Sequence, residues 1–205
     1  MTARRLVIAL PGLRVKPEDF EINGFIAALK GKAEMTVPPI GPNDYIERDF
    51  AETLKARVIA PARDAGYGRI ALLALSSGAL GALRYVTRFE ADIEGLIFLA
   101  PFLANPGTIA EVERAGGLAS WTPGQLSVTD IERPGLLWLK KRAAEGRGPW
   151  LHLAFGTEDR FQSGARLLAE VTPAGSVTSC PGGHDWPTWI QLWTTMLDHL
   201  PIAKP

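Results

Sequence analysis

The sequence predicts an α/β fold, a three-layer sandwich in which helices cover both faces of a mostly parallel sheet of about six strands. Short apolar runs without polar alternation, as expected of strands buried on both faces, occupy residues 5–10, 70–75, 95–100 and 150–155. Segments with apolar residues at helical spacing separate these runs, and this alternation implies parallel strands joined by right-handed crossovers. A chain of 205 residues that is 46% hydrophobic can bury one sizeable core.

Helices are expected between the strands, and two further short strands complete the sheet. The helices are predicted over residues 17–30, 45–65 and 188–200, and the short strands over 34–37 and 177–180. Apolar residues spaced one helical turn apart form a stripe on the second helix: Ile46, Phe50, Leu54 and Val58. Pro61 should kink or restart this helix, because proline lacks the N–H that a helix interior needs.

One long interruption separates the fourth and fifth expected strands, at about residues 103–149. It is rich in Gly and Pro, but Thr108 with Glu111 could form a capping box, and Pro134 is placed to open a helix through Ala144. Connections of this length are usually lids or binding elements. We therefore predict a single domain over residues 1–205 with a lid-like insertion at about 103–149.

The composition narrows the possible partners. Lys plus Arg and Asp plus Glu both number 22, so neither nucleic acid nor an anionic membrane surface is an expected partner. No apolar run approaches membrane-spanning length, and no His, Cys and Asp cluster has metal-ligand spacing. The single cysteine, Cys180, allows no internal disulfide and indicates a reducing compartment, so we expect a cytoplasmic protein without metal or cofactor. Cys180 lies in a strand-like stretch, where a buried thiol is more common than a nucleophile.

The strand at residues 70–75 ends in Ser76-Ser77-Gly78 and leads directly into a helix. A nucleophilic serine in a strand–turn–helix elbow has the pattern G-x-S-x-G, with small residues that let strand and helix approach closely. Here Ala74 replaces the first glycine. Two other interpretations remain open at this point: a turn without chemistry, and a dinucleotide-binding loop. The second lacks its first glycine and the expected acid after the next strand.

A serine nucleophile needs a base, and the base needs a third group to orient it. In this fold class the acid and the histidine follow the serine in that order, on loops at strand ends. The strand at residues 150–155 is followed by a loop that contains Glu158 and Asp159, and the last strand is followed by a glycine-flanked histidine, His184. The other two histidines lie within a strand (His152) and near the end of the last helix (His199). The position expected for the acid and the position expected for the histidine are therefore both occupied by a residue of the right kind.

The elbow ALSSG, the loop GTEDRF and the tail GGHDW resemble the α/β-hydrolase superfamily, nearest to its small serine esterases. The likeness covers nearly the whole chain outside residues 103–149, and the first strand here corresponds to the family's third. The resemblance implies Ser76 as nucleophile, His184 as general base and then acid, and Asp159 as the orienting carboxylate. Asp159 is favoured over its acidic neighbour because the family's acid lies three residues past the glycine.

The oxyanion hole is expected to use two backbone N–H groups. One belongs to Ser77, at a helix N-terminus whose dipole favours negative charge. The resemblance implies a second from Leu13, since family members with H-G-x after this strand use the residue after the glycine; Pro11 replaces that histidine here. Trp121 and Trp138, in the insertion, are candidates for the wall of an acyl pocket, although packing within the insertion would also explain them.

The resemblance and the constellation together predict a serine hydrolase, a carboxylesterase or thioesterase that cleaves a small ester through an acyl-enzyme. The alternative is a protein of the same fold that binds a small molecule or acts as a scaffold without catalysis. The presence of serine, acid and histidine together argues against this alternative. Nothing in the sequence predicts the oligomeric state.

Overall fold

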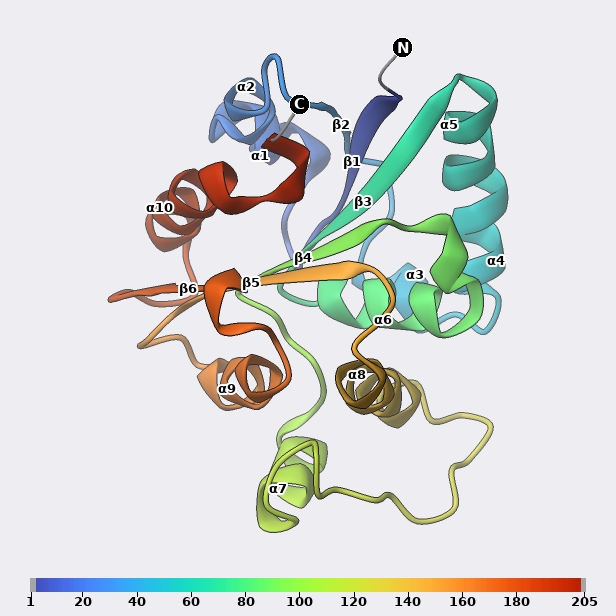
Figure 1. Ribbon diagram of the computed structural model, residues 1–205, viewed down its shortest axis with the longest axis vertical. Coiled ribbons are helices and arrows are strands. Elements are labelled where there is room, and N and C mark those ends of the chain that lie inside the picture. The colour runs from blue at the N-terminus through green and yellow to red at the C-terminus, as the bar shows by residue number, and fades with distance from the viewer. Residues whose placement is uncertain (1–2, 204–205) are drawn as a thin grey trace.

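A six-stranded, all-parallel sheet forms the centre of the computed structural model, which describes residues 3–203 (Figure 1). Its strands are β1 (Arg4–Leu10), β2 (Glu34–Thr36), β3 (Tyr67–Leu75), β4 (Gly95–Leu99), β5 (Trp150–Gly156) and β6 (Val177–Cys180). They lie in the order β2-β1-β3-β4-β5-β6, and each neighbouring pair is parallel. At the carboxyl end of β3, Ala74 pairs with Leu10 of β1 and with Phe98 of β4. The predicted fold class is confirmed.

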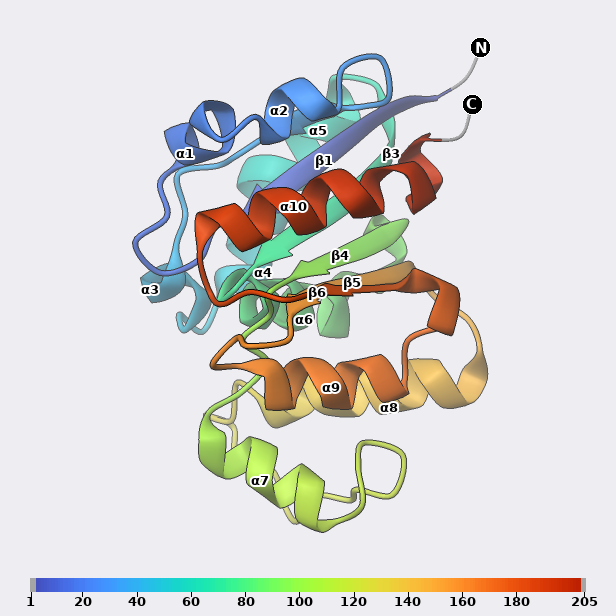
Figure 2. The ribbon, with the colours of Figure 1, turned by 90° about the vertical axis from the view of Figure 1, so that its left-hand side faces the viewer.

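Helices cover both faces of the sheet, because alternate residues of the buried strands point to opposite sides. Val7 and Ala9 face α1 (Pro17–Ile22), α2 (Phe25–Ala28) and α10 (Trp186–Met196) in one apolar cluster. Figure 2 shows this layer in front of the sheet. Leu6 and Ile8 belong to the cluster on the opposite face. The helices of that layer include α4 (Phe50–Leu54), α6 (Gly78–Phe89), α8 (Arg133–Glu145) and α9 (Gln162–Glu170).

Two predicted helices differ in part from the structure. The helix expected over residues 17–30 is divided at Gly24, whose φ of 78° is left-handed and ends one helix before the next begins. The helix expected over 45–65 begins later, at Phe50, and from there is continuous to Asp64, while α3 (Pro42–Tyr45) is a separate short helix. The continuous part consists of α4, a π-helical turn (Lys55–Ile59) and α5 (Ala60–Asp64). Pro61 lies in the first turn of α5, directly after the π-helical turn, so the predicted restart is confirmed.

The segment at residues 103–149 contains two helices with different surroundings. α8 packs against α6, since a Cβ at Gly135 would lie 2.7 Å from Leu83 Cβ, and Leu136 is fully buried. α7 (Pro106–Arg114) lies farther from the sheet (Figure 1). Asn105 caps α7 by accepting the Thr108 N–H at 3.1 Å, so the predicted capping box of Thr108 with Glu111 is wrong. The role of the segment as a lid stays a prediction.

Candidate active site

Ser76 lies on a sharp turn between β3 and α6. Its φ of 53° is left-handed, a conformation that costs free energy in a residue other than glycine and is often found at functional sites. Two backbone hydrogen bonds hold the turn: the Ser76 N–H donates to the Leu99 carbonyl at 3.0 Å, and the Phe102 N–H donates to the Ser76 carbonyl at 2.9 Å. The serine is therefore fixed above the carboxyl ends of β3 and β4.

Two glycines allow the backbone to close around this turn. A Cβ at Gly78 would lie 2.1 Å from the Leu10 carbonyl oxygen, so no larger residue fits where α6 begins. A Cβ at Gly12 would lie 2.8 Å from the Cβ of Ser76. Gly12 was not singled out from the sequence, although a glycine directly after a buried strand is a usual sign of close backbone approach. Ala74, which departs from the glycine of the motif, is fully buried in the sheet.

His184 lies on the loop between β6 and α10, and the neighbouring residue fixes the start of that helix. The Asp185 carboxylate accepts hydrogen bonds from the Thr188 hydroxyl at 2.7 Å and from the Thr188 N–H at 3.0 Å. These hydrogen bonds lower the pKa of Asp185, as expected for a helix cap. At Gly182 φ is 138° and a Cβ would lie 2.3 Å from Thr188 Oγ1, so glycine is needed there.

The acidic loop after β5 is joined to the histidine loop through backbone hydrogen bonds. The Glu158 N–H donates to the Gly182 carbonyl at 3.0 Å, although the Glu158 side chain itself is exposed. Asp159 is 1% exposed, and its Oδ1 accepts the Phe161 N–H at 2.8 Å. The structure thus turns Asp159, and not Glu158, toward the interior.

These loops bring Ser76, His184 and Asp159 together in one hydrogen-bonded chain. Ser76 Oγ lies 2.9 Å from His184 Nε2, and His184 Nδ1 lies 2.7 Å from Asp159 Oδ2. The His184 ring makes edge-to-face contacts with Phe161 and Trp189, with ring centroids 4.9 and 5.1 Å apart. With a proton on Nδ1, the imidazole donates to the carboxylate and keeps the lone pair of Nε2 for the serine hydroxyl.

The fold of this chain is similar to that of several solved structures. No protein-family model and no curated protein matches this sequence. A fluorophosphonate-binding serine hydrolase F from Staphylococcus aureus superposes with a TM-score of 0.68 at 13% identity, over 100% of this chain and 86% of its own. S-formylglutathione hydrolase from the same organism gives 0.62 at 13%, over 100% and 84%. Monoacylglycerol lipase from Paleococcus ferrophilus gives 0.56 at 16%, over 93% and 94%.

The chain has the α/β-hydrolase fold. The resemblance seen in the sequence is therefore confirmed at the level of the fold. The similar structures include an S-formylglutathione hydrolase, a ferulic acid esterase and a monoacylglycerol lipase, all at 16% identity or less. Because proteins with this one fold are named for such different substrates, the fold does not identify the substrate of this chain; function depends on the site and not on the fold.

The two expected oxyanion residues lie on either side of the serine. Ser77 directly precedes α6, as the residue after the nucleophile does in the α/β-hydrolase fold. Its Oγ is buried without a hydrogen-bond partner among the described residues. Leu13 follows Gly12, whose Cα approaches Ser76 closely, while the Leu13 side chain is 67% exposed. Both therefore have their backbone near Ser76, and their part in an oxyanion hole stays a prediction.

The two tryptophans expected to line an acyl pocket have other surroundings. Trp138 Nε1–H donates to Glu90 at 2.5 Å, and Glu90 follows the C-terminal end of α6, whereas Ser76 precedes its N-terminal end. A helix of 12 residues is about 18 Å long, so Trp138 lies far from the serine. Trp121 is 1% exposed, and its Nε1–H donates to Glu111 on α7 at 2.9 Å. The expectation for Trp138 is therefore corrected, whereas Trp121 packs within the insertion and its part in an acyl pocket stays a prediction.

The remaining reactive groups lie outside the site. Burial raises the pKa of the Cys180 thiol, which disfavours the thiolate that a cysteine nucleophile needs. Burial, with His199 nearby, lowers the pKa of His152 inside the sheet layer. Within residues 3–203, no three His, Cys, Asp or Glu side chains gather as a metal site requires. None of the helices in this range is both long and apolar enough to cross a bilayer.

Proposed function

We propose that this protein is a serine hydrolase that cleaves a small carboxylic ester or thioester through an acyl-enzyme. The observation that carries the proposal is the unbroken hydrogen-bonded chain from Ser76 Oγ through the imidazole of His184 to the carboxylate of Asp159. A serine hydroxyl is a weak nucleophile until a base removes its proton, and this chain supplies the base and the group that orients it.

In the first half of the reaction, Ser76 Oγ attacks the carbonyl carbon of the ester while His184 Nε2 takes the hydroxyl proton. The carbonyl oxygen becomes an oxyanion, for which the Ser77 and Leu13 N–H groups are the proposed donors. Collapse of this intermediate breaks the bond to the alcohol or thiol, which leaves with the proton from Nε2. Removing one oxyanion donor typically costs about 3 to 4 kcal/mol of transition-state stabilisation.

In the second half, water attacks the acyl-enzyme and gives its proton to His184 Nε2. The carboxylic acid leaves as the proton returns to Ser76 Oγ, so the enzyme is regenerated. The cycle needs no redox step, metal or cofactor. General acid–base catalysis by such a histidine typically contributes about 10²- to 10⁴-fold to the rate. We also retain the cytoplasm as its proposed location, because the single cysteine allows no internal disulfide.

A fluorophosphonate probe tests the proposal, because it reacts with an activated serine and not with an ordinary hydroxyl. The wild type should be labelled, and Ser76→Ala should not be. Ser120→Ala is the matched control, since this exposed serine in the connection after α7 lies outside the chain of three residues. If the wild type and Ser120→Ala are not labelled, the hydrolase proposal is wrong and the non-catalytic alternative remains.

A further inference from the structure

A cavity of about 260 Å³ lies between the start of α7, the acidic loop and α9. Most of its lining is apolar: Phe102, Leu103, Ala104, Pro106, Ile109 and Phe161, together with Gly164. Ser163, Glu113 and Arg160 are the polar residues of the lining, and the apolar part offers no group to satisfy a charge. Burying an unpaired charge in such surroundings is strongly unfavourable.

The aromatic wall of this cavity is in contact with the catalytic chain. The Phe161 ring packs edge-to-face on His184 with centroids 4.9 Å apart, and on Phe102 with centroids 5.1 Å apart. The backbone of Phe102 is tied to Ser76 by the 2.9 Å hydrogen bond between its N–H and the serine carbonyl. A group attached to Ser76 Oγ that extends along these two rings therefore reaches the cavity.

We propose that this cavity binds the acyl group of the substrate and restricts it to an uncharged, apolar chain of up to about eight carbons. The inference rests on the proposed hydrolase function and adds the substrate class to it. A volume of about 260 Å³ holds about nine groups of the size of a water molecule, at ~30 Å³ each. A methylene group has nearly that size, so chains of twelve carbons or more would extend out of the cavity.

Charged groups at the rim do not change this preference. Arg160 and Glu113 lie at the opening of the cavity, and both are exposed. The Arg160 guanidinium lies over the Phe161 ring, 4.9 Å from its centroid. Because both rim side chains are solvated, an ion pair with either of them would contribute little free energy to binding. The preference among acyl chains is therefore set by the apolar part of the cavity.

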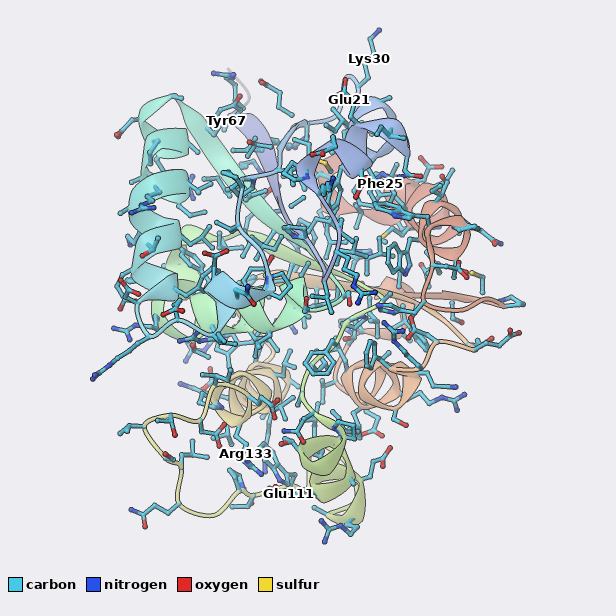
Figure 3. All side chains as sticks on the ribbon, turned by 180° about the vertical axis from the view of Figure 1, so that it is seen from behind. Glu21, Phe25, Lys30, Tyr67, Glu111 and Arg133 are labelled. Carbon is cyan, nitrogen blue, oxygen red and sulfur yellow. The ribbon has the colours of Figure 1, made fainter. Side chains whose placement is uncertain are left out.

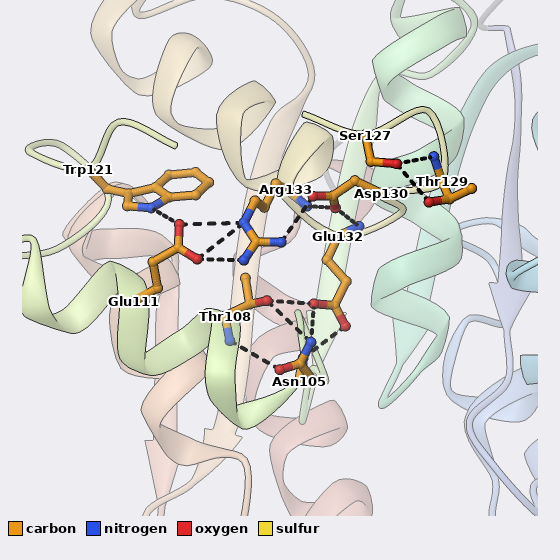
Figure 4. Close-up of polar contacts among 9 residues, drawn as sticks. All are labelled: Asn105, Thr108, Glu111, Trp121, Ser127, Thr129, Asp130, Glu132 and Arg133. Carbon is orange, nitrogen blue, oxygen red and sulfur yellow. Dashed lines mark hydrogen bonds and ion pairs between the residues drawn. The ribbon is translucent and has the colours of Figure 1, made fainter. Parts of the chain in front are cut away.

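The wall formed by α7 is held rigidly to the start of α8. Glu132 accepts hydrogen bonds from the Asn105 N–H at 2.9 Å and from the Thr108 hydroxyl at 2.8 Å (Figure 4). Arg133 forms an ion pair with Glu111 of α7 at 2.5 Å, and Figure 3 shows the two residues side by side. A wall fixed at both ends of α7 cannot move outward easily, so the limit on chain length should be sharp.

The experiment measures kcat/KM for p-nitrophenyl esters from acetate to dodecanoate. For the wild type we expect a rise of up to about fourfold per added methylene while the chain fills the cavity. The maximum should fall between hexanoate and octanoate, and dodecanoate should react at least tenfold more slowly than the best ester. Fluorophosphonate labelling of the same samples reports separately whether the serine is active.

Two substitutions change the size of the cavity in opposite directions. Ile109→Ala removes three carbons from the wall and should move the maximum toward longer chains by about two carbons, with acetate hydrolysis nearly unchanged. Gly164→Ala should move it toward shorter chains. Its Cβ would lie 3.4 Å from Ile109 Cδ1, which is an ordinary contact, so the variant should fold. Gly175→Ala is the matched control, since a Cβ there meets no atom within 4 Å.

The possible results separate this inference from the hydrolase proposal. If the protein is labelled and hydrolyses acetate, but the chain-length profile is identical in all variants, the cavity is not the acyl site and the hydrolase proposal stands. If the variants change only a series of acetate esters with increasing alcohol length, the cavity binds the leaving group and the acyl assignment is wrong. A wild type that is neither labelled nor active overturns both.

Discussion

Two clusters of hydrogen-bonded acidic side chains in this molecule differ in how deeply they are buried and in the role we expect for them. In the proposed catalytic chain of Ser76, His184 and Asp159, the Asp159 side chain is 1% exposed and hydrogen-bonded to His184 Nδ1. In the cluster between α7 and α8, Arg133 pairs with Glu111 and Asp130, and the Arg133 and Glu111 side chains are 30% and 31% exposed. Figure 4 shows this second cluster, which we call the α7–α8 clamp.

The difference lies in where each set of hydrogen bonds ends. The proposed catalytic chain ends at a serine hydroxyl on a strained turn, 2.9 Å from a ring nitrogen that can accept its proton. The clamp ends at groups that only hold structure, such as the N–H of Asn105 and the indole N–H of Trp121. Changes in the catalytic chain should therefore lower activity and leave stability nearly intact, while changes in the clamp should do the reverse.

Asp159→Asn should cause the largest effect, a loss of about 10⁴-fold in kcat with the fold retained. The carboxylate accepts two N–H groups, from Phe161 and from His184. An amide has one acceptor oxygen and one donor NH₂ group, so it can accept only one of them. If the NH₂ faces the imidazole, Nδ1 must accept, and the proton on Nε2 prevents this nitrogen from acting as the base for Ser76.

Steady-state kinetics with a short p-nitrophenyl ester and circular dichroism test this prediction. Glu158→Gln is the matched control, because it changes the adjacent but exposed carboxylate, and it should stay within twofold of the wild type. Equal losses in both variants would mean that local charge, and not the orientation of His184, determines the rate.

Gly12→Ala should lower kcat/KM by about 10²-fold, because displacing a reacting group by about an ångström costs that much. The new Cβ would lie 2.8 Å from Ser76 Cβ, so the serine turn or the Gly12 loop has to move. Gly124→Ala, where a Cβ meets no atom within 4 Å, is the control. Full activity of Gly12→Ala in the same ester assay would show that the turn tolerates this displacement.

Arg133→Met should lower the free energy of unfolding by about 1 kcal/mol, a value kept small because the ion pairs are partly exposed. The rate with p-nitrophenyl acetate should not change, because a short acyl group does not reach the α7 wall that Arg133 holds. The Arg133 guanidinium holds the pKa of Glu111 below its usual value of 4.5. A carboxylate whose pKa is lowered on folding stabilises the folded protein at any pH above its pKa in the unfolded chain. This stabilisation is lost as the pH falls through its pKa in the folded protein.

Denaturant unfolding of both proteins between pH 3 and pH 7 measures this pH dependence. The difference between wild type and Arg133→Met should be constant above about pH 4.5 and shrink on further acidification. Arg57→Met serves as the control, since Arg57 is an exposed arginine on the π-helical turn between α4 and α5. A difference that stays the same at every pH would exclude the carboxylates as its source.

The sheet and the catalytic chain could be predicted from the sequence because both depend on patterns that survive without coordinates. Buried parallel strands show as continuous apolar runs, and residues at their carboxyl ends must meet at one edge of the sheet. Since Ser76, Asp159 and His184 each follow such a strand, their positions along the chain were enough to predict that they lie in one region. Phe161 and Trp189, which contact the His184 ring, gave no comparable signal, because an aromatic residue near a motif usually belongs to the core.

The errors have two sources: local signals that were overlooked and contacts that form only on folding. The break at Gly24 belongs to the first kind, because Asn23-Gly24 is a dipeptide typical of turns. Trp138 lies on α8, and which side of this helix meets α6 is set by Leu136 and Gly135, whose contacts appear only on folding. The cap of α7 is Asn105 and not Thr108; an Asn directly before Pro106 is a local helix-start signal, and the cap hydrogen bond spans only three residues.

His152 provides the smallest expected effect and contrasts with His184, since it is a buried histidine without an acidic partner. Burial, and next the nearby His199, lower the pKa of His152 below its usual value of 6.5. The unfolded chain therefore binds more protons than the folded one below about pH 6.5, so stability should fall as the pH drops from there toward the folded pKa. His152→Leu keeps the apolar packing and removes this proton uptake. Unfolding curves of the two proteins should diverge on acidification from pH 7.5 to 5; parallel curves would show that His152 titrates normally.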